Sequence, residues 1–285
     1  MLMKKVKVKV PAKTNLTLDV LGIDDKGYHM LSSLVSSIDL YDTVILKKRK
    51  DNKITLKEKG LKSGCEIEKN NAFKTAKLYA EKYSSCGIDI TLKKRIPVGG
   101  GLGGSSADIS GVLKGLNVLN KKDNDLLPLA SALGSDVSFM LNGGLAVIEG
   151  KGDTVKPIKK LLNLYMIILT EKESVSAKES YKQFDLDSKT YEDCTEKALN
   201  KLYSDDLDGF LSLIKNDLEP ASKKILNKID KNVKILYDIG AKKALMTGSG
   251  SAVFGVFERK KIRDAAFKNL PKHIRKSAIK VQTIN

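Results

Sequence analysis

The sequence lacks several features that assign a protein to a class at once. It has no apolar run approaching the length of a membrane span, and residues 1–7 carry no apolar signal core. Its 3 cysteines, Cys65, Cys86 and Cys194, are too few and too widely spaced to indicate a disulfide framework or a zinc site. We therefore expect a cytoplasmic protein with reduced thiols, no membrane partner and no metal-binding side chains.

Acidic residues are scarce relative to basic ones. The 51 Lys and Arg residues face 34 Asp and Glu residues, which gives a formal net charge of +17. Such a charge could serve nucleic-acid binding. However, Lys is spread along the whole chain and no nucleic-acid-binding motif accompanies it, so we interpret the charge as a solvated, Lys-rich surface. A positive field would also attract anionic substrates. We expect a small-molecule substrate and no nucleic-acid partner, while the oligomeric state stays open.

Glycine, in contrast, is concentrated in one stretch. This stretch consists of Pro97, Val98, Gly99, Gly100, Gly101, Leu102, Gly103, Gly104, Ser105, Ser106, Ala107 and Asp108. Residues 88–92 alternate like a strand before it, and Val112, Leu113 and Leu116 follow at helical spacing. The predicted order is strand, glycine loop and helix N-terminus.

This order predicts a polyphosphate-binding loop. Glycine lets a ligand approach the backbone closely, and the first N–H groups of a helix are unpaired and lie at the positive end of its dipole. The serine hydroxyls add further donors to such an anion site. A loop that uses glycine only for packing is the weaker interpretation, because so many glycines are clustered here.

The loop differs from other phosphate-binding loops. A P-loop ends in Gly-Lys-Ser/Thr, and no Lys follows these glycines. Pro97 and the missing acidic residue argue against a dinucleotide fingerprint. The tripeptides His-Arg-Asp and Asp-Phe-Gly of protein kinases do not occur.

A polar strand face precedes the loop. Lys13 and Asn15 are two positions apart and share one face of a predicted strand, which Thr17 and Asp19 continue. Taken by itself, this segment would be interpreted as solvent-exposed. Tyr28 and His29 follow after a charged turn.

Single polar residues elsewhere allow two interpretations. A lone His such as His29 is more often structural, but beside Tyr28 it could form the wall of a site. Asp136 follows a glycine in an apolar neighbourhood. It could be a helix N-cap or a general base at the start of a buried helix.

A second glycine-serine loop lies between two strand-like runs. It occupies residues 240–255 and contains Gly248 and Ser249. It is another candidate for phosphate binding or for loop packing. We place a domain boundary between residues 158 and 159, where the pattern of strands and helices restarts.

Three separated segments, in the same order, resemble the GHMP superfamily of small-molecule kinases. They are the strand at Lys13, the loop 97–108 and the loop 240–255. Within the superfamily, residues 11–16, 27–31, 133–139 and 174–177 are most similar to the 4-diphosphocytidyl-2-C-methyl-D-erythritol kinases. The resemblance runs nearly end to end and implies an α+β fold with two domains. Residues 1–158 would resemble the second domain of ribosomal protein S5, and residues 159–285 would be ferredoxin-like.

The resemblance also implies a reaction. ATP, accompanied by Mg²⁺, would bind on the glycine loop, residues 97–108. Its γ-phosphoryl group would pass to the 2-hydroxyl of the methylerythritol unit, a step in the non-mevalonate route to isoprenoid precursors. Asp136 would be the general base and Lys13 its cationic partner. The residues implied to bind the substrate are Asn15, Tyr28, His29, Gly248 and Ser249.

The chain departs from the family pattern at three positions. Ser105 stands where a third glycine is usual, Ser138 where proline often stands, and Thr247 where serine is frequent. Two alternatives stay open within the superfamily. One is a kinase for another alcohol or phosphate, against which the Tyr28–His29 pair speaks. The other is a paralogue that binds ATP with weak turnover.

Overall fold

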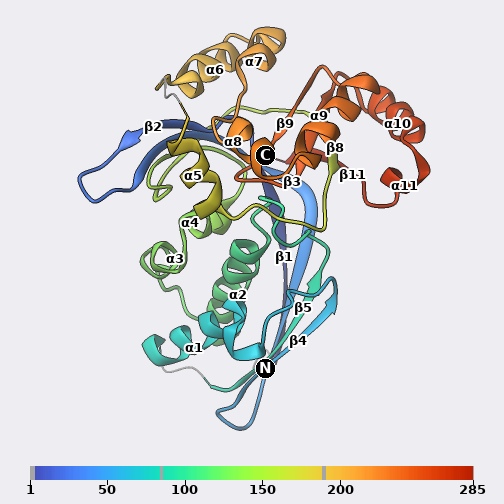
Figure 1. Ribbon diagram of the computed structural model, residues 1–285. Helices are drawn as coiled ribbons and strands as arrows, with labels where there is room; N and C mark the ends of the chain where they lie inside the picture. Colours follow the sequence, from blue (N-terminus) through green and yellow to red (C-terminus); the bar gives the residue numbers. More distant parts are fainter. Residues whose placement is uncertain (1–3, 84–85, 188–190, 285) are drawn as a thin grey trace. The chain divides into compact units, whose positions relative to one another are not determined.

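The chain folds into two compact units, each assembled from several segments. The computed structural model describes residues 4–83, 86–187 and 191–284 (Figure 1). The first unit contains residues 1–12, 40–98 and 103–143, and the second contains residues 13–39, 99–102 and 144–285. The boundary between residues 158 and 159 stays a prediction.

The first unit combines a small sheet with helices. Its elements are β1 (Lys5–Asn15, up to residue 12), β3 (His29–Lys48, from residue 40), β4 (Ile54–Gly60), η1 (Ile67–Lys69), α1 (Asn71–Tyr83), β5 (Ile88–Lys94), α2 (Gly104–Asn120), α3 (Leu127–Leu133) and α4 (Ser135–Asn142) (Figure 1). β5 pairs antiparallel with β3 and parallel with β4. Helices α1 and α4 pack against α2.

Glycine allows α2 to lie close to the sheet of the first unit. A Cβ atom at Gly111 would lie 2.5 Å from Cγ2 of Val44, and one at Gly115 would lie 2.7 Å from Cδ1 of Leu46. The predicted apolar positions of the helix, including Val112 and Leu113, are buried. The helical period therefore identified the face of α2 that enters the core.

The second unit is built on a mainly antiparallel sheet. Its further elements are β2 (Asp19–Ile23), β6 (Leu145–Gly150), β7 (Thr154–Pro157), β8 (Tyr165–Leu169), α5 (Ala177–Asp185), α6 (Cys194–Tyr203), α7 (Leu207–Leu213), α8 (Glu219–Ile225), α9 (Lys228–Asp238), β9 (Lys243–Met246), β10 (Val253–Phe257), α10 (Lys260–Asn269), α11 (Lys272–Arg275) and β11 (Ile279–Ile284) (Figure 1). Five strands lie in the order β3-β11-β8-β10-β9. β2 and β6 pair with β3, and β7 pairs with β6.

Apolar side chains from strands and helices form one core in the second unit. Ile167 of β8, Leu236 of α9 and Met246 of β9 are each fully buried in it. Helices α9 and α10 supply its cover over the strands. In the described part of the chain, no helix has the length and apolarity needed to cross a bilayer.

The sequence pattern also predicts a strand break at Pro11 and a single helix over residues 222–231, and both of these local predictions are wrong. The polar strand is not broken at Pro11, because β1 continues through it from Lys5 to Asn15. The single helix expected around residues 222–231 is two helices, since Leu226 has an extended backbone (φ −135°, ψ 93°) that ends α8 before α9 begins. Helix α8 begins earlier than expected, and Pro220 occupies its first turn, a favoured place for proline.

Candidate functional site

The glycine loop connects β5 to α2, as predicted. Gly99, Gly101 and Gly103 have φ angles of 70°, 74° and 71°, which L side chains rarely adopt. Gly103 is the N-cap of α2, and no side chain caps it. Gly103 therefore offers no side-chain acceptor to the first N–H groups of α2, which begin at Gly104. These groups can donate hydrogen bonds to an anion.

The remaining loop residues divide into exposed and buried ones. Val98 and Ser105 are exposed, whereas Pro97, Gly104 and Ser106 are half-buried. The buried ones are Gly100, Leu102, Ala107 and Asp108. Ser105, where the family usually has glycine, lies within α2, and its hydroxyl accepts a hydrogen bond from Nδ2 of Asn71 at 2.9 Å. Its backbone is not in the left-handed region, so the serine brings no strain to the loop.

The middle of the glycine loop lies against the second glycine-serine loop. A Cβ atom at Gly101 would lie 2.2 Å from the carbonyl oxygen of Thr247, so only glycine fits there. The N–H of Ala252 donates to the carbonyl oxygen of Gly100 at 3.3 Å. Both contacts lie within the second unit. Two motifs about 150 positions apart are therefore packed together.

Gly248 and Ser249 belong to this contact region. Gly248 has a φ angle of 59° and approaches Gly101 so closely that a Cβ atom would lie 3.2 Å from its Cα. Nδ2 of Asn216 donates to the carbonyl oxygen of Gly248 at 2.8 Å. The hydroxyl of Ser249 donates to the carbonyl oxygen of Val175 at 3.3 Å. These bonds hold the second loop in one conformation.

Lys13 and Asn15 join the same region from the end of β1. Nζ of Lys13 donates to Oδ1 of Asn15 at 2.6 Å, and both residues are buried. The N–H of Lys13 donates to the carbonyl oxygen of Leu102 at 3.1 Å. The N–H of Asn15 donates to the hydroxyl of Thr247 at 3.0 Å. The three segments that were singled out in the sequence thus meet within the second unit.

The polar face that starts at Lys13 is buried, so its interpretation as solvent-exposed is wrong. Nδ2 of Asn15 donates to the hydroxyl of Ser33 at 2.8 Å. The hydroxyl of Thr17 lies 2.6 Å from that of Thr195, which in turn donates to Oδ2 of Asp19 at 2.6 Å. The strand pattern identified the face, but its partners come from elsewhere in the chain.

Asp19 is a fully buried carboxylate at the far end of this face. Nζ of Lys215 lies 3.4 Å from its Oδ1. Burial raises the pKa of Asp19, and the hydrogen bonds from Thr195 and the charge of Lys215 oppose that rise. The sequence did not predict Thr195 and Lys215 as partners of this face. Thr195 lies in α6 and Lys215 follows α7, and no local pattern distinguishes them from the other polar residues of these segments.

Tyr28 and His29 lie in different surroundings within the second unit. Tyr28 is 58% exposed, and Nζ of Lys151 lies 4.3 Å from the centroid of its ring. The His29 ring stacks on Tyr181 with centroids 4.4 Å apart, and its Nε2 lies 2.9 Å from Oδ1 of Asp185. Tyr181 and Asp185 of α5 were not predicted as site residues.

Asp136 lies in the first turn of α4, in the first unit. Gly134 is the N-cap of this helix, so Asp136 itself is not the cap. Its carboxylate is in the turn at the positive end of the helix dipole. Lys13 belongs to the second unit, and its pairing with Asp136 stays a prediction.

No protein-only metal site is present in the described residues. They contain no group of three or more His, Cys, Asp or Glu side chains that could hold an ion. None of the three cysteines, all of which lie in the described part of the chain, forms a disulfide.

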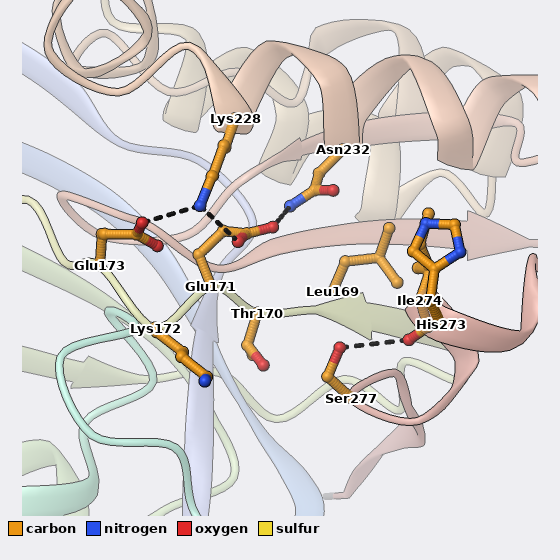
Figure 2. A pocket seen from close by; sticks show the side chains of 10 residues that line it. All are labelled: Leu169, Thr170, Glu171, Lys172, Glu173, Lys228, Asn232, His273, Ile274 and Ser277. Atoms are coloured by element: carbon orange, nitrogen blue, oxygen red, sulfur yellow. Dashed lines mark hydrogen bonds and ion pairs between the residues drawn. The ribbon is translucent and has the colours of Figure 1, made fainter.

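A separate pocket of about 490 Å³ lies in the second unit, beyond the end of β8 (Figure 2). Four of its polar side chains interact in pairs: Nζ of Lys228 lies 2.7 Å from Oε1 of Glu173, and Nδ2 of Asn232 donates to Oε1 of Glu171 at 2.8 Å (Figure 2). None of the predicted site residues lines it. We therefore do not assign the site to this pocket.

Comparison with known proteins decides the family. The family of GHMP kinases N terminal domains matches residues 70–146, and that of GHMP kinases C terminal domains matches residues 196–276. A 4-diphosphocytidyl-2-C-methyl-D-erythritol kinase of Alkaliphilus metalliredigens is 34% identical over 276 residues, which is 94% of this chain and 93% of that protein. The chain belongs to the 4-diphosphocytidyl-2-C-methyl-D-erythritol kinase family.

Other similar proteins support the same family assignment. The protein of that name from Thermodesulfovibrio yellowstonii is 36% identical, with 91% of this chain and 92% of the relative covered. A crystal structure of 4-(cytidine 5'-diphospho)-2C-methyl-D-erythritol kinase matches with a TM-score of 0.83 and 28% identity, over 98% of this chain and 100% of that chain. A homoserine kinase from Cytophaga hutchinsonii, 21% identical, shares the fold with a TM-score of 0.76, over 100% of this chain and 96% of that chain. The predicted α+β GHMP kinase fold is confirmed.

Proposed function

We propose that this protein is a kinase that transfers the γ-phosphoryl group of ATP to the 2-hydroxyl of 4-diphosphocytidyl-2-C-methyl-D-erythritol. This step belongs to the non-mevalonate route to isoprenoid precursors. The observation that carries the proposal is the similarity to kinases of that name, which covers 93% of the length of the relative from Alkaliphilus metalliredigens. The meeting of Lys13, the middle of the glycine loop (residues 99–102) and the second loop within one unit supports it.

ATP binds through the glycine loop in this proposal. The backbone N–H groups from Gly99 to Ser106 surround the phosphates, and the hydroxyls of Ser105 and Ser106 add donors. The N-terminal end of α2 contributes its positive dipole. The positive φ angles of Gly99, Gly101 and Gly103 support this role, because they turn successive N–H groups of the loop in directions that L side chains rarely allow.

Asp136 acts as the general base and Lys13 as its cationic partner. The Asp136 carboxylate takes the proton from the substrate hydroxyl as that oxygen bonds to the γ-phosphorus, and the bond to the ADP oxygen breaks. The Lys13 ammonium stabilises the negative charge on the transferring group. Asn15 accepts a hydrogen bond from Lys13 and orients its ammonium.

The nucleotide part of the second substrate is bound by aromatic and polar groups. Tyr28 presents an exposed ring that can stack on the cytosine base. His29 hydrogen-bonds to the base, and its ring is fixed by Tyr181 and Asp185. Gly248 and Ser249 face the substrate from the second loop.

ATP brings Mg²⁺ to the site. When bound with ATP, Mg²⁺ would supply positive charge beside the phosphates. The enzyme works in the cytoplasm, where ATP is available, and acts on small molecules without a nucleic-acid or membrane partner.

The test is ADP release by the purified protein with ATP, Mg²⁺ and 4-diphosphocytidyl-2-C-methyl-D-erythritol. We expect turnover that requires the substrate, and a loss of about 10²- to 10⁴-fold in the Asp136→Asn variant. No turnover by folded protein that still binds ATP would contradict the proposal. That result would favour a different alcohol substrate or a weakly active paralogue.

A further inference from the structure

A buried ion cluster stands beside the glycine loop in the first unit. We call Asp42, Lys94 and Asp108 the Lys94 cluster. Lys94 is the last residue of β5, and its Nζ contacts Oδ2 of Asp42 and lies 2.5 Å from Oδ2 of Asp108. The three residues are 0%, 5% and 6% exposed, respectively. No residue of this cluster is needed for the transfer chemistry proposed above.

The cluster holds both ends of the glycine loop. Oδ1 of Asp42 accepts hydrogen bonds from the N–H groups of Arg95 at 2.5 Å and Ile96 at 2.9 Å, where the chain leaves β5. At the other end, Lys94 binds Asp108 in the second turn of α2 and lies 3.5 Å from the carbonyl oxygen of Gly104. One ammonium thus joins the entry of the loop to its exit.

Burying the charged groups of this cluster costs free energy. This cost indicates what the cluster does. Two buried carboxylates share one ammonium, and Oδ1 of Asp108 has no hydrogen-bond partner among the described residues. Burial raises the pKa of Asp108 to about 7, against the attraction of Lys94. A well-packed apolar trio is often as stable as a buried ion cluster of this kind. Overall stability is therefore a weak reason for its presence, and directional bonds to the loop ends are a better one.

We propose that Asp42, Lys94 and Asp108 are positioning residues that hold the glycine loop in the conformation that binds the ATP phosphates. The proposal rests on the function proposed for that loop. It implies that the cluster acts on ATP binding through the loop and leaves the binding of the cytidyl substrate unchanged.

The first variant to measure is Lys94→Met, which keeps the apolar stem and removes the ammonium. We expect the KM for ATP to rise by at least about tenfold, because a small displacement of binding groups is costly. The KM for the cytidyl substrate should change by less than about twofold. Amide hydrogen exchange in peptides covering residues 95–106 should become faster in the absence of any ligand, while exchange in β8 stays unchanged.

Lys223→Met is the matched control. Lys223 also lies between two carboxylates, with Nζ 2.9 Å from Glu219 and 2.9 Å from Asp230, but it belongs to α8 of the second unit. We expect neither a change in the KM for ATP nor faster exchange in residues 95–106. An equal effect in the control would overturn the proposal, because it would show a general loss of stability.

A pair of variants at Asp108 covers the case in which Lys94→Met does not fold. Asp108→Asn keeps an oxygen that can accept from Lys94, whereas Asp108→Leu removes it. We expect Asp108→Leu to raise the KM for ATP and Asp108→Asn to restore it to within about threefold of the wild-type value. Equal KM values for ATP in Asp108→Leu and wild type, with unchanged loop exchange, would overturn the proposal.

The exchange measurement separates this proposal from the proposed function. If the wild-type protein shows no turnover with the cytidyl substrate, the proposed function fails. Faster exchange of the loop in Lys94→Met, together with weaker binding of a fluorescent ATP analogue, would still support the Lys94 cluster as the group that positions the loop.

Discussion

At the scale of single residues, Gly101 shows how closely the two loops of the second unit approach. It has a left-handed backbone, and its missing Cβ leaves room for the carbonyl oxygen of Thr247. Lys13 and Asn15 depend on the same region for their backbone hydrogen bonds. A change at this one position should therefore affect both the stability of the protein and its site.

We expect Gly101→Ala to lower the free energy of unfolding more than Gly64→Ala. Gly64 has a nearly equal φ angle of 76° but open space around its Cβ position. In the control, Gly64→Ala, the free energy of unfolding should fall by only about 1–2 kcal/mol, which is the cost of a left-handed backbone for alanine. In Gly101→Ala the free energy of unfolding should fall by about 1–3 kcal/mol more, because the added methyl group overpacks the contact. Urea unfolding of both variants measures this, and equal losses would contradict the close approach.

Asp108 makes stability depend on pH. Its pKa in the folded protein is raised to about 7, first by burial and also by Asp42 and Glu58, while Lys94 opposes the rise. The folded state therefore keeps this proton at pH values where the unfolded chain has released it. The contribution of Asp108 to the free energy of unfolding falls as the pH rises from about 4 to about 7.

The variant Asp108→Asn should remove this dependence. Relative to wild type, the variant should be more stable at pH 8 than at pH 5, by a difference on the order of 1 kcal/mol or more. Urea unfolding at the two pH values measures it. Lys94, whose pKa is raised by its two carboxylates despite burial, stays charged throughout this range. If the variant and the wild type differ by the same free energy of unfolding at both pH values, this prediction is contradicted.

At the scale of elements, α5 carries the residues that hold His29. A capping box begins this helix: the hydroxyl of Ser176 accepts from the N–H of Glu179, and the Glu179 carboxylate accepts from the N–H of Ser176. Tyr181 and Asp185 follow on the same helix. The start of α5 thus influences a residue proposed to bind the cytidine.

We expect Ser176→Ala to weaken the helix by about 1 kcal/mol. The KM for the cytidyl substrate should rise by no more than about fivefold, since 1.4 kcal/mol corresponds to a factor of ten. The KM for ATP should not change. Asp206→Ala is the control, because Asp206 caps α7 through the N–H of Gly209 at 2.8 Å. It should lower stability similarly and leave both KM values unaltered, and steady-state kinetics would reveal any deviation.

The helices and strands followed from the sequence to different degrees. The order of β5, glycine loop and α2 was predicted because the strand alternation, the glycines and the helical spacing are all local signals. The two-helix pair α8 and α9 was missed, because Leu226 is compatible with either a helix or a break and only packing decided its conformation. Helix α11 was also missed; it has 4 residues, which is too few for a periodic pattern.

At the scale of the whole molecule, the net charge of +17 bears on the substrates. Both ATP and a cytidine diphosphate ester are anions, and a positive protein field speeds their approach. Screening reduces this effect as the ionic strength rises.

We expect kcat/KM for both substrates to fall as the salt concentration increases from about 50 to about 200 mM, with kcat nearly constant. Initial rates at low and high substrate concentration measure the two constants. Binding to arbitrary DNA serves as the comparison. Tight DNA binding at about 200 mM salt would revive the interpretation of the charge as a nucleic-acid-binding surface.

The amino-acid sequence by itself determined the class of the fold and the resemblance to the kinase family, and it carries the prediction that the glycine loop binds phosphate. These depend on short runs of residues whose propensity and spacing act locally. Only the tertiary structure decided which side chains from distant parts of the chain pair with each other. Asp19 meets Thr195 across 176 positions, His29 meets Asp185 across 156, and Lys94 meets Asp42 across 52. Such pairings depend on how the strands and helices pack, and no local pattern distinguishes Lys94 from the other basic residues of this chain.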